Sequence, residues 1–313
     1  MNNNIIGNDL IFIELGSYAT KILDWRGEEN LCPPIVNPYN LISIEGNFQL
    51  KVFNKSVIYR LKKRLKELTR PTTKIIAFAT GIYRNSTNAN TSLKILCAIP
   101  NLELFVLTPK EEVLLSCNSI LKSNNKLTNK IVYIDIGGGS TEIAYLLNGD
   151  LIRFVSIDLG LLLMTVHFFH HSSNIHSGLT KINDKFEKVI EPVKGFLEDI
   201  GLMIYENECT VLVTGMVVKK IDKKYLNDNT IEFNAYSEYL DFLQLILTKY
   251  DDIQDLNNSF KKSENCKMKL SMYLGGAFLH LLLIHINAQK FKINFNGLSN
   301  GFRQQYLKKI NKS

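Results

Sequence analysis

One short pattern occurs twice in this chain, and it constrains the fold more than any other feature of the sequence. Residues 11–22 read IFIELGSYATKI, and residues 132–143 read VYIDIGGGSTEI. Each copy has an apolar run, a carboxylate, a glycine-containing turn, a threonine and a second run. This order is typical of a β-hairpin, and its repetition indicates that two parts of the chain begin in the same way.

The turns of the two hairpins have the composition of phosphate-binding loops. Glycine lets the backbone approach a ligand closely, and successive N–H groups in such a turn can bind phosphate oxygens. Neighbouring hydroxyl groups add donors. The candidate phosphate-binding residues in the two turns are Gly16, Ser17, Gly137, Gly138, Gly139, Ser140 and Thr141, with Thr20 as a further hydroxyl.

A carboxylate precedes each turn, Glu14 in the first copy and Asp135 in the second. Such a side chain can hold Mg²⁺ through water, which suits an ion that dehydrates reluctantly and bridges phosphates. The alternative is that the glycines only form tight hairpins. Because an acid at the same offset in both copies has no purpose in a simple turn, the repeat favours two hairpins that clasp a phosphate chain.

The size and charge of the chain agree with a two-domain protein that has an anionic partner. A chain of 313 residues usually divides into two domains, and the polar stretch 122–126 places the boundary after residue 125. The net charge of +7 favours an anionic ligand. Residues 1–4 lack the basic and apolar regions of a secretory signal, which predicts a cytoplasmic protein. The apolar stretch 270–286 reads as a buried helix, so no membrane partner is expected.

The remaining sequence alternates expected strands with expected helices, which predicts an α/β protein. A helix over residues 57–70 has one apolar and one basic face. The basic face reads as solvated because no aromatic residues interleave to stack bases, and no nucleic-acid partner is expected. A continuous helix is predicted over 181–206. The expected strands are residues 11–14, 18–25, 74–79, 102–107, 131–136, 140–147, 151–157 and 209–214.

Several motifs taken together resemble the exopolyphosphatase and guanosine pentaphosphate phosphohydrolase family. They are DIGGGSTE at 135–142, ATGIYR at 79–84, KEE at 110–112, SIDLG at 156–160, LGGA at 274–277 and GLSNG at 297–301. The resemblance covers nearly the whole chain and fits the short members of the family. That family belongs to the actin, sugar kinase and Hsp70 superfamily.

The resemblance implies a fold of two actin-like, ribonuclease H-like lobes. Each lobe is a mixed sheet flanked by helices, with a cleft between the lobes. The first lobe comprises residues 1–125, joined by a C-terminal helix at about 300–313, and the second comprises residues 126–299. Whether the protein forms a homodimer is left open.

The resemblance also implies an activity, the Mg²⁺-dependent release of terminal phosphate from inorganic polyphosphate or guanosine pentaphosphate. Asp135 becomes a catalytic carboxylate on the metal side, with Glu14 as a second metal carboxylate. Arg84 becomes a phosphate clamp and Glu111 the base that activates water. A guanidinium suits phosphate, although an arginine at such a junction can equally be a solvated surface residue. Glu111 has a structural alternative, since Thr108-Pro109-Lys110-Glu111 also fits a capping box.

The sequence departs from the family pattern in the first hairpin and after the late strand 209–214, which opens two further functions. Glu14, Tyr18 and Ala19 replace Asp, Asn and Ser in the first hairpin, and 215–217 read GMV where Gly-Gly-Thr is usual. One alternative is a catalytically degenerate sensor that binds a phosphorylated nucleotide or polyphosphate without turnover. The other is an ATP-dependent kinase, which the altered glycine pair disfavours.

Overall fold

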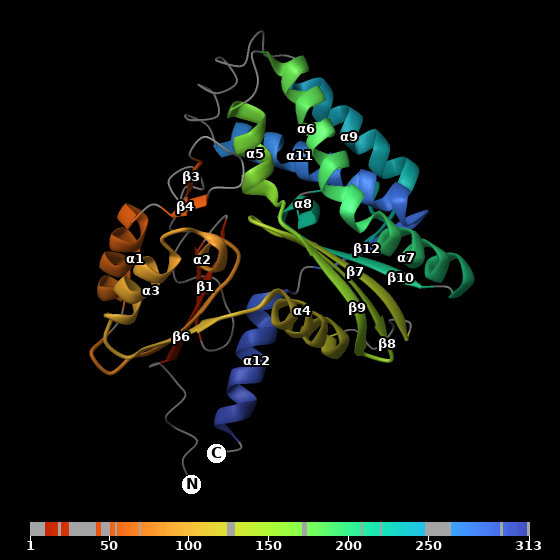
Figure 1. The fold of residues 1–313 in the computed structure, drawn as a ribbon. Helices are drawn as coiled ribbons and strands as arrows, with labels where there is room; N and C mark the ends of the chain where they lie inside the picture. Colours follow the sequence, from red (N-terminus) through yellow and green to blue (C-terminus); the bar gives the residue numbers. More distant parts are fainter. Residues whose placement is uncertain are drawn as a thin grey trace. The chain divides into compact units, whose positions relative to one another are not determined.

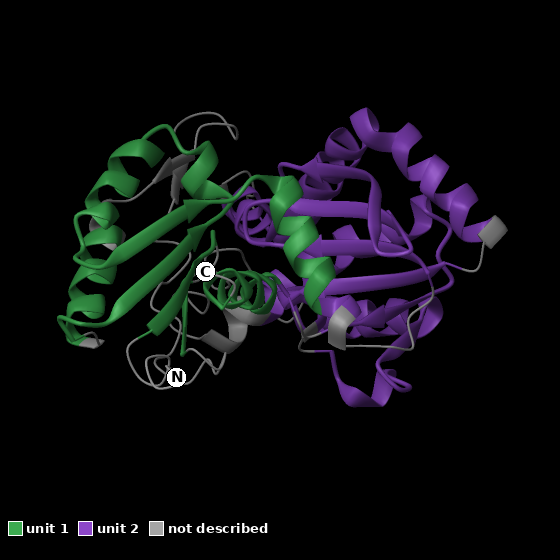
Figure 2. Cartoon of the chain, turned by 90° about the horizontal axis from the view of Figure 1, so that it is seen from below, with its two compact units in different colours: residues 1–119, 298–313 green, residues 120–297 purple. Residues whose placement is uncertain are grey.

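The computed structural model describes two compact units, which Figure 2 colours separately. Unit 1 consists of residues 1–119 and 298–313, and unit 2 consists of residues 120–297. The described residues are 10–17, 20–24, 42–44, 51–53, 55–68, 70–123, 129–170, 174–207, 209–219, 221–247, 264–294 and 297–311. Each unit is an α/β structure with its own mixed sheet, as the sequence predicted.

Unit 1 is built on a four-stranded sheet in the order β2-β1-β5-β6. Its strands are β1 (Leu10–Leu15), β2 (Thr20–Asp24), β5 (Lys74–Ala79) and β6 (Leu102–Val106), and β3 (Ile42–Ile44) and β4 (Lys51–Phe53) pair separately. β1 and β2 form the predicted antiparallel hairpin, whereas β5 is parallel to both β1 and β6. The parallel pairing places the chain that follows β5 beside the turn of the first hairpin.

Helices cover both faces of the unit 1 sheet (Figure 1). They are α1 (Lys55–Leu68), α2 (Ile82–Asn85), α3 (Ala89–Cys97), α4 (Pro109–Ser123) and α12 (Leu298–Ile310). α1 buries Leu61 and Leu65 and exposes basic side chains, as its pattern predicted. α12 packs on the other face, where Phe302 stacks on Phe78 with ring centroids 4.4 Å apart and Tyr306 meets the edge of Phe12. These aromatic contacts attach the C-terminal helix to unit 1.

Unit 2 has a six-stranded sheet in the order β11-β12-β10-β7-β8-β9. Its strands are β7 (Lys130–Ile136), β8 (Thr141–Leu147), β9 (Asp150–Ile157), β10 (Thr210–Gly215), β11 (Thr230–Glu232) and β12 (Lys290–Ile293). β7, β8 and β9 form the expected antiparallel meander, and β10 runs parallel to β7 and β12. The second turn of the meander has positive φ at Asn148 (54°) and Gly149 (88°), which a two-residue hairpin of this kind requires.

Along the chain, the helices of unit 2 lie between its strands. They are α5 (Leu161–His170), α6 (Ile175–Ile190), α7 (Lys194–Asn207), α8 (Met216–Lys219), α9 (Phe233–Leu247) and α11 (Glu264–His285), with 3₁₀ turns η2 (Glu191–Val193) and η3 (Lys223–Tyr225). The continuous helix predicted over 181–206 is wrong. α6 ends and η2 begins next to Pro192, whose ring removes a helical N–H and restricts φ.

The long apolar stretch near the C-terminus lies in α11, which is the buried helix that the sequence predicted. Leu274, Phe278 and Leu282 have no exposed surface. In the described part of the chain, no helix combines the length and apolarity that crossing a membrane needs.

The division between the units differs in detail from the sequence-based boundary. The structure divides the chain after Ser119, inside α4, and again before Leu298. The polar stretch 122–126 was expected to be a linker, but α4 continues through Ser123 and residues 124–128 lie outside the described residues. Helical hydrogen bonding thus extends into a segment whose composition resembled a loop.

Candidate functional site

The turn of the second hairpin has the hydrogen bonding of an anion-binding loop. The Gly137 N–H donates to the Ser140 carbonyl over 3.0 Å and closes the turn. The carbonyl oxygens of Gly137 and Gly138 accept the first two N–H groups of α5 over 2.9 and 2.8 Å. Among the described residues, no acceptor takes the N–H of Gly138 or Gly139. The loop therefore has satisfied carbonyl groups and adjacent N–H donors that a phosphate oxygen can accept.

Gly160, which directly precedes α5, packs against the backbone of this loop. A Cβ atom there would lie 2.6 Å from the Gly137 oxygen, 2.6 Å from the Gly138 carbonyl carbon and 2.7 Å from the Gly139 nitrogen. Side chains do not approach backbone atoms so closely, so only glycine fits. The position of α5 against the loop therefore depends on this residue.

The two hydroxyl residues of the loop differ in what they can offer a ligand. Thr141 is fully buried, and its hydroxyl donates to the Leu159 carbonyl over 2.7 Å. Its proton is thus already used within the protein. The Ser140 hydroxyl makes no hydrogen bond within the described part of the chain, and the residue is 8% exposed. Of the two, Ser140 is the better candidate donor to phosphate.

Asp135 lies near the end of β7, and its side chain is positioned by neighbouring strands. The Tyr133 hydroxyl lies 3.0 Å from its Oδ2 atom and also 3.0 Å from the Thr214 hydroxyl on β10. Gly215 has φ of 103°, and a Cβ atom there would be 3.2 Å from Asp135 Oδ1 and 2.5 Å from the Ile136 oxygen. The carboxylate is partly exposed and held by a buried hydroxyl network.

The carboxylate of the first hairpin, in unit 1, forms an ion pair. Lys21 stands directly opposite Glu14 on β2, and its ammonium lies 3.1 and 3.0 Å from the two carboxylate oxygens. The Ser299 hydroxyl, at the start of α12, donates to the same carboxylate. The Glu14 side chain is only 14% exposed. Its charge is therefore neutralised by a neighbour within the fold.

The turn of the first hairpin is described as far as Ser17, and residues 18 and 19 lie outside the described residues. The Ser17 hydroxyl accepts the Ile82 N–H over 3.0 Å, which connects the hairpin to the start of α2. Tyr83 beside it is buried, and burial raises the pKa of its hydroxyl above the ordinary value. Ser17 thus has a structural contact, although its own proton is not used by that bond. Gly16 immediately precedes it.

Arg84 lies on α2 and makes an ion pair that the sequence did not predict. Its guanidinium donates to Glu112 on α4 and to the Leu107 carbonyl. The side chains of Arg84 and Glu112 are 14% and 13% exposed. Arg84 is therefore a positioned, half-buried cation with a carboxylate beside it, and the solvated-surface alternative does not describe it.

Glu111 forms the capping box that its spacing predicted. Its carboxylate accepts the Thr108 N–H over 2.8 Å, and the Thr108 hydroxyl accepts the Glu111 N–H over 3.3 Å. The side chain is exposed. The structural alternative for Glu111 is confirmed, while its role as a base stays a prediction. Of the two adjacent glutamates, Glu112 is the one in contact with Arg84.

The two proposed metal carboxylates differ in how well they suit Mg²⁺. Glu14 does not fit, because an ammonium group contacts both of its oxygens and a hydroxyl donates to one of them. Asp135 is a better fit, because it is partly exposed and Tyr133 contacts it through a neutral hydroxyl. No group of three or more His, Cys, Asp or Glu side chains in the described residues is arranged to hold a metal. An ion at Asp135 would take most ligands from water and phosphate, as Mg²⁺ commonly does.

The chain is a two-unit α/β protein in which each unit has a mixed sheet with a glycine hairpin. Comparisons with known proteins identify its family. The sequence matches the Ppx/GppA phosphatase family over residues 40–309, so the chain belongs to that family. A search among curated protein sequences gave no match.

Two solved structures share the fold. An exopolyphosphatase from Cytophaga hutchinsonii has 13% sequence identity and a TM-score of 0.66, with 96% of this chain and 98% of that chain covered. A Ppx/GppA family member from Aquifex aeolicus has 17% identity and a TM-score of 0.58, with the same coverage. The predicted family is confirmed, and so is a fold of two units that are each a mixed sheet flanked by helices.

Sequence reasoning missed four residues that shape these sites. They are Lys21, which pairs with Glu14; Glu112, which pairs with Arg84; Tyr133, which contacts Asp135; and Ser299, which also contacts Glu14. Lys21 and Tyr133 could have been found, because cross-strand and i, i+2 positions on a strand share a face. The contacts of Glu112 and Ser299 join distant parts of the sequence and have no local signal.

Proposed function

We propose that this protein hydrolyses a phosphoanhydride, releasing the terminal phosphate of inorganic polyphosphate or guanosine pentaphosphate. Membership of a phosphatase family supports hydrolysis in general. The observation that carries the proposal is the glycine loop of unit 2. Its carbonyl groups are bonded to α5, and the N–H groups of Gly138 and Gly139 have no acceptor among the described residues.

In the proposed reaction, water attacks the terminal phosphorus atom and the bridging P–O bond breaks. The loop amides and the Ser140 hydroxyl would donate to the phosphate oxygens, where negative charge must be stabilised. The Arg84 guanidinium suits a second phosphate contact because its planar donors match two oxygens. To make that contact it would exchange one of its present acceptors for phosphate.

The proton released by water must pass to a base, and the bridging oxygen of the shortened chain leaves as an anion. We assign this base to Glu112, whose side chain is only 13% exposed and which would be released as a base when Arg84 exchanges it for phosphate. Glu111 remains the alternative, although its carboxylate is used by the capping box. A carboxylate base of this kind contributes about 10² to 10⁴-fold to the rate.

We further propose that Asp135 orients a Mg²⁺ ion, which when bound would neutralise charge on the phosphates. The Tyr133 contact would hold the carboxylate in place. Glu14 is not assigned to the metal, because Lys21 already neutralises it.

The decisive assay measures free phosphate released from long-chain polyphosphate and from guanosine pentaphosphate, with and without Mg²⁺. Asp135→Asn should lose Mg²⁺-dependent release while keeping a similar shape and an acceptor for Tyr133. Asp150→Asn, an exposed position at the start of β9, is the matched control and should behave as wild type. Full release by Asp135→Asn would refute the assignment of Asp135.

A second function, a sensor that binds without turnover, is favoured by one observation. The first-hairpin carboxylate is neutralised by Lys21 and accepts a hydrogen bond from Ser299, which makes it a poor metal ligand. A sensor would bind polyphosphate and release no phosphate. Phosphate that appears on an added acceptor would instead identify a kinase.

A further inference from the structure

The outer face of α1 in unit 1 carries a row of cations. Arg60, Lys63 and Lys66 are exposed there, and Lys62 beside them is partly exposed. Residues three or four positions apart lie on adjoining turns of a helix, so these side chains are neighbours on one side of α1. From Arg60 to Lys66 the row is about 9 Å long, at about 1.5 Å per residue. These four residues form the basic face of α1.

The cations of this face have no carboxylate partners. Glu67 is the one acid in α1, and its carboxylate is paired with Arg64 over 3.0 Å. Within the part of the chain that the structure describes, none of the four residues of the basic face forms an ion pair. Like charges three or four residues apart destabilise a helix. An anion bound across the face would therefore stabilise α1 as well as satisfy its charges.

A linear polyanion fits this face better than a compact ion. The charges are spread along the helix, so a chain of anions can contact all of them at once. Lysine binds phosphate as a point charge on a flexible stem, which suits a chain without fixed geometry. Tyr59 is the single aromatic residue of α1, and one ring cannot stack successive bases. The face therefore suits a phosphate chain without bases better than a nucleic acid.

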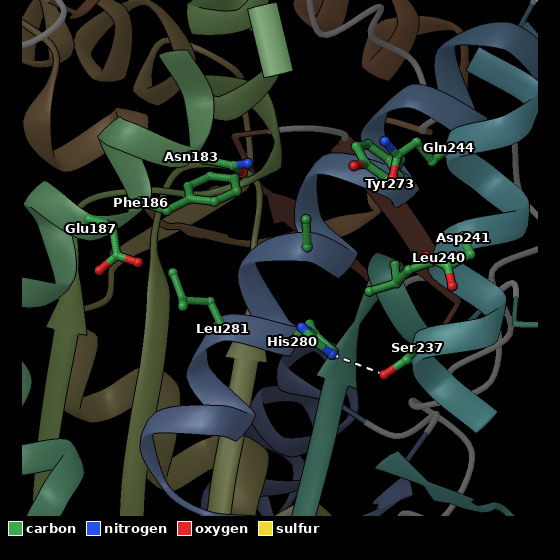
Figure 3. A pocket seen from close by; sticks show the side chains of 11 residues that line it. Asn183, Phe186, Glu187, Ser237, Leu240, Asp241, Gln244, Tyr273, His280 and Leu281 are labelled. Atoms are coloured by element: carbon green, nitrogen blue, oxygen red, sulfur yellow. Dashed lines mark hydrogen bonds between the residues drawn. The ribbon is translucent and has the colours of Figure 1, made fainter. Parts of the chain in front are cut away.

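The helical pocket of unit 2 has the opposite charge. It lies among α6, α9 and α11 and has a volume of about 350 Å³ (Figure 3). Its acidic side chains are Glu187 and Asp241, and among the described residues neither Lys nor Arg lines it. This pocket does not suit a phosphate chain, whereas the basic face of α1 does.

We propose that the basic face of α1 binds an internal stretch of long-chain polyphosphate. The proposal rests on the function proposed above, which makes a phosphate chain the substrate, and it favours inorganic polyphosphate over guanosine pentaphosphate. The face contains no residue of the glycine loop, so it would retain the polymer without taking part in the chemistry. Contacts at two places on one flexible chain raise the apparent affinity, because the second contact forms within the same complex.

The test combines Arg60→Gln, Lys63→Gln and Lys66→Gln in one α1 variant and titrates it with long-chain polyphosphate by calorimetry, with a chelator in place of Mg²⁺. The variant should bind about 3- to 100-fold more weakly than wild type, because each exposed ion pair contributes about 1.4- to 5-fold. The slope of log affinity against log salt should become shallower by about one for each cation removed. Affinity for tripolyphosphate should change much less. Unchanged affinity for the long chain would overturn the proposal.

A matched control removes the same charge elsewhere. Lys194→Gln, Lys290→Gln and Lys308→Gln combined lie at exposed positions on α7, β12 and α12. This control should bind long-chain polyphosphate as wild type does. Melting curves check folding, and the α1 variant should melt no lower than wild type because it removes like charges from one helix face. An equal loss of affinity in both variants would show that net charge, and not α1, binds the polymer.

Single-stranded RNA of comparable length tests the alternative polymer in the same titration. RNA should bind more weakly than polyphosphate, since one exposed ring offers little stacking. RNA that binds more tightly, and that loses this affinity in the α1 variant, would overturn polyphosphate as the occupant.

Kinetics separate this proposal from the proposed hydrolysis. With long-chain polyphosphate the α1 variant should raise KM and leave kcat unchanged, because contacts far from the reacting phosphate bind the ground state and the transition state alike. Wild-type release of phosphate with unchanged KM in the α1 variant would refute the role of α1 and leave hydrolysis standing. A wild-type chain that releases no phosphate would refute hydrolysis, while the titrations, which need no turnover, would still decide whether α1 binds the polymer.

Discussion

Replacing Gly160 by alanine should damage the glycine loop while leaving most of unit 2 intact. The added Cβ atom would lie 2.6 Å from backbone atoms of Gly137 and Gly138, whereas ordinary contact begins near 3.4 Å. The loop or the start of α5 must therefore move by about 0.8 Å, which is 3.4 minus 2.6. Overpacking of this kind costs about 1–3 kcal/mol. A displacement of about 1 Å at a reacting group can lower turnover by about 10²-fold.

The assay is phosphate release from polyphosphate beside a thermal melting curve. Gly195→Ala, in α7, is the matched control, because a Cβ atom there meets nothing within 4 Å. This control should keep full turnover and gain slightly in stability, by about 0.5–1 kcal/mol, from better helix propensity. Wild-type turnover and affinity in Gly160→Ala would refute the claim that the loop geometry binds the phosphate.

Four other substitutions test the groups of unit 1. Glu112→Gln should lower turnover by about 10² to 10⁴-fold and also lower the melting temperature, because it leaves the Arg84 guanidinium without its counter-charge, so turnover is compared well below that temperature. Glu111→Gln should stay near wild type in turnover; the reverse result would return the base to Glu111. Arg84→Lys should weaken polyphosphate binding by about tenfold in a salt-dependent titration, because an ammonium cannot reproduce bidentate geometry; unchanged affinity would remove Arg84 from the site. Lys21→Met should leave Glu14 without its cation, so that Mg²⁺ raises the melting temperature of this variant more than that of wild type; an identical Mg²⁺ response would contradict the ion-pair argument.

The sequence predicted the hairpins and the helix cap, because these structures depend on residues that are close together in the chain. The two hairpins follow from alternation and glycine turns, and each one forms where the repeat placed it. The capping box at Thr108 and Glu111 follows from a spacing of three residues, and its reciprocal bonds are present. Proline at position 192 is a local signal for a helix break, because it restricts φ and lacks an N–H. The prediction of one continuous helix gave more weight to the helical periodicity on both sides of it.

Contacts between distant residues could not be predicted in the same way. Glu112 meets Arg84 across 28 positions, and Ser299 meets Glu14 across 285. The family resemblance assigned the base to Glu111, whereas the only local role that the sequence shows for Glu111 is the capping box. The motif SIDLG at 156–160 included Gly160, but its close approach to the loop depends on how α5 packs, which the motif does not show. Whether a carboxylate can bind a metal or accept a proton depends on its ion-pair partner. Here the partners of Glu14 and Glu112 come from other helices or strands.

The most direct test of the central claim is phosphate release by the wild-type chain from long-chain polyphosphate in the presence of Mg²⁺. The account predicts steady release of inorganic phosphate from the chain ends, dependent on Asp135 and on Gly160. Tight binding of polyphosphate, measured by calorimetry, without release of phosphate from it or from guanosine pentaphosphate would contradict hydrolysis and identify the protein as a sensor.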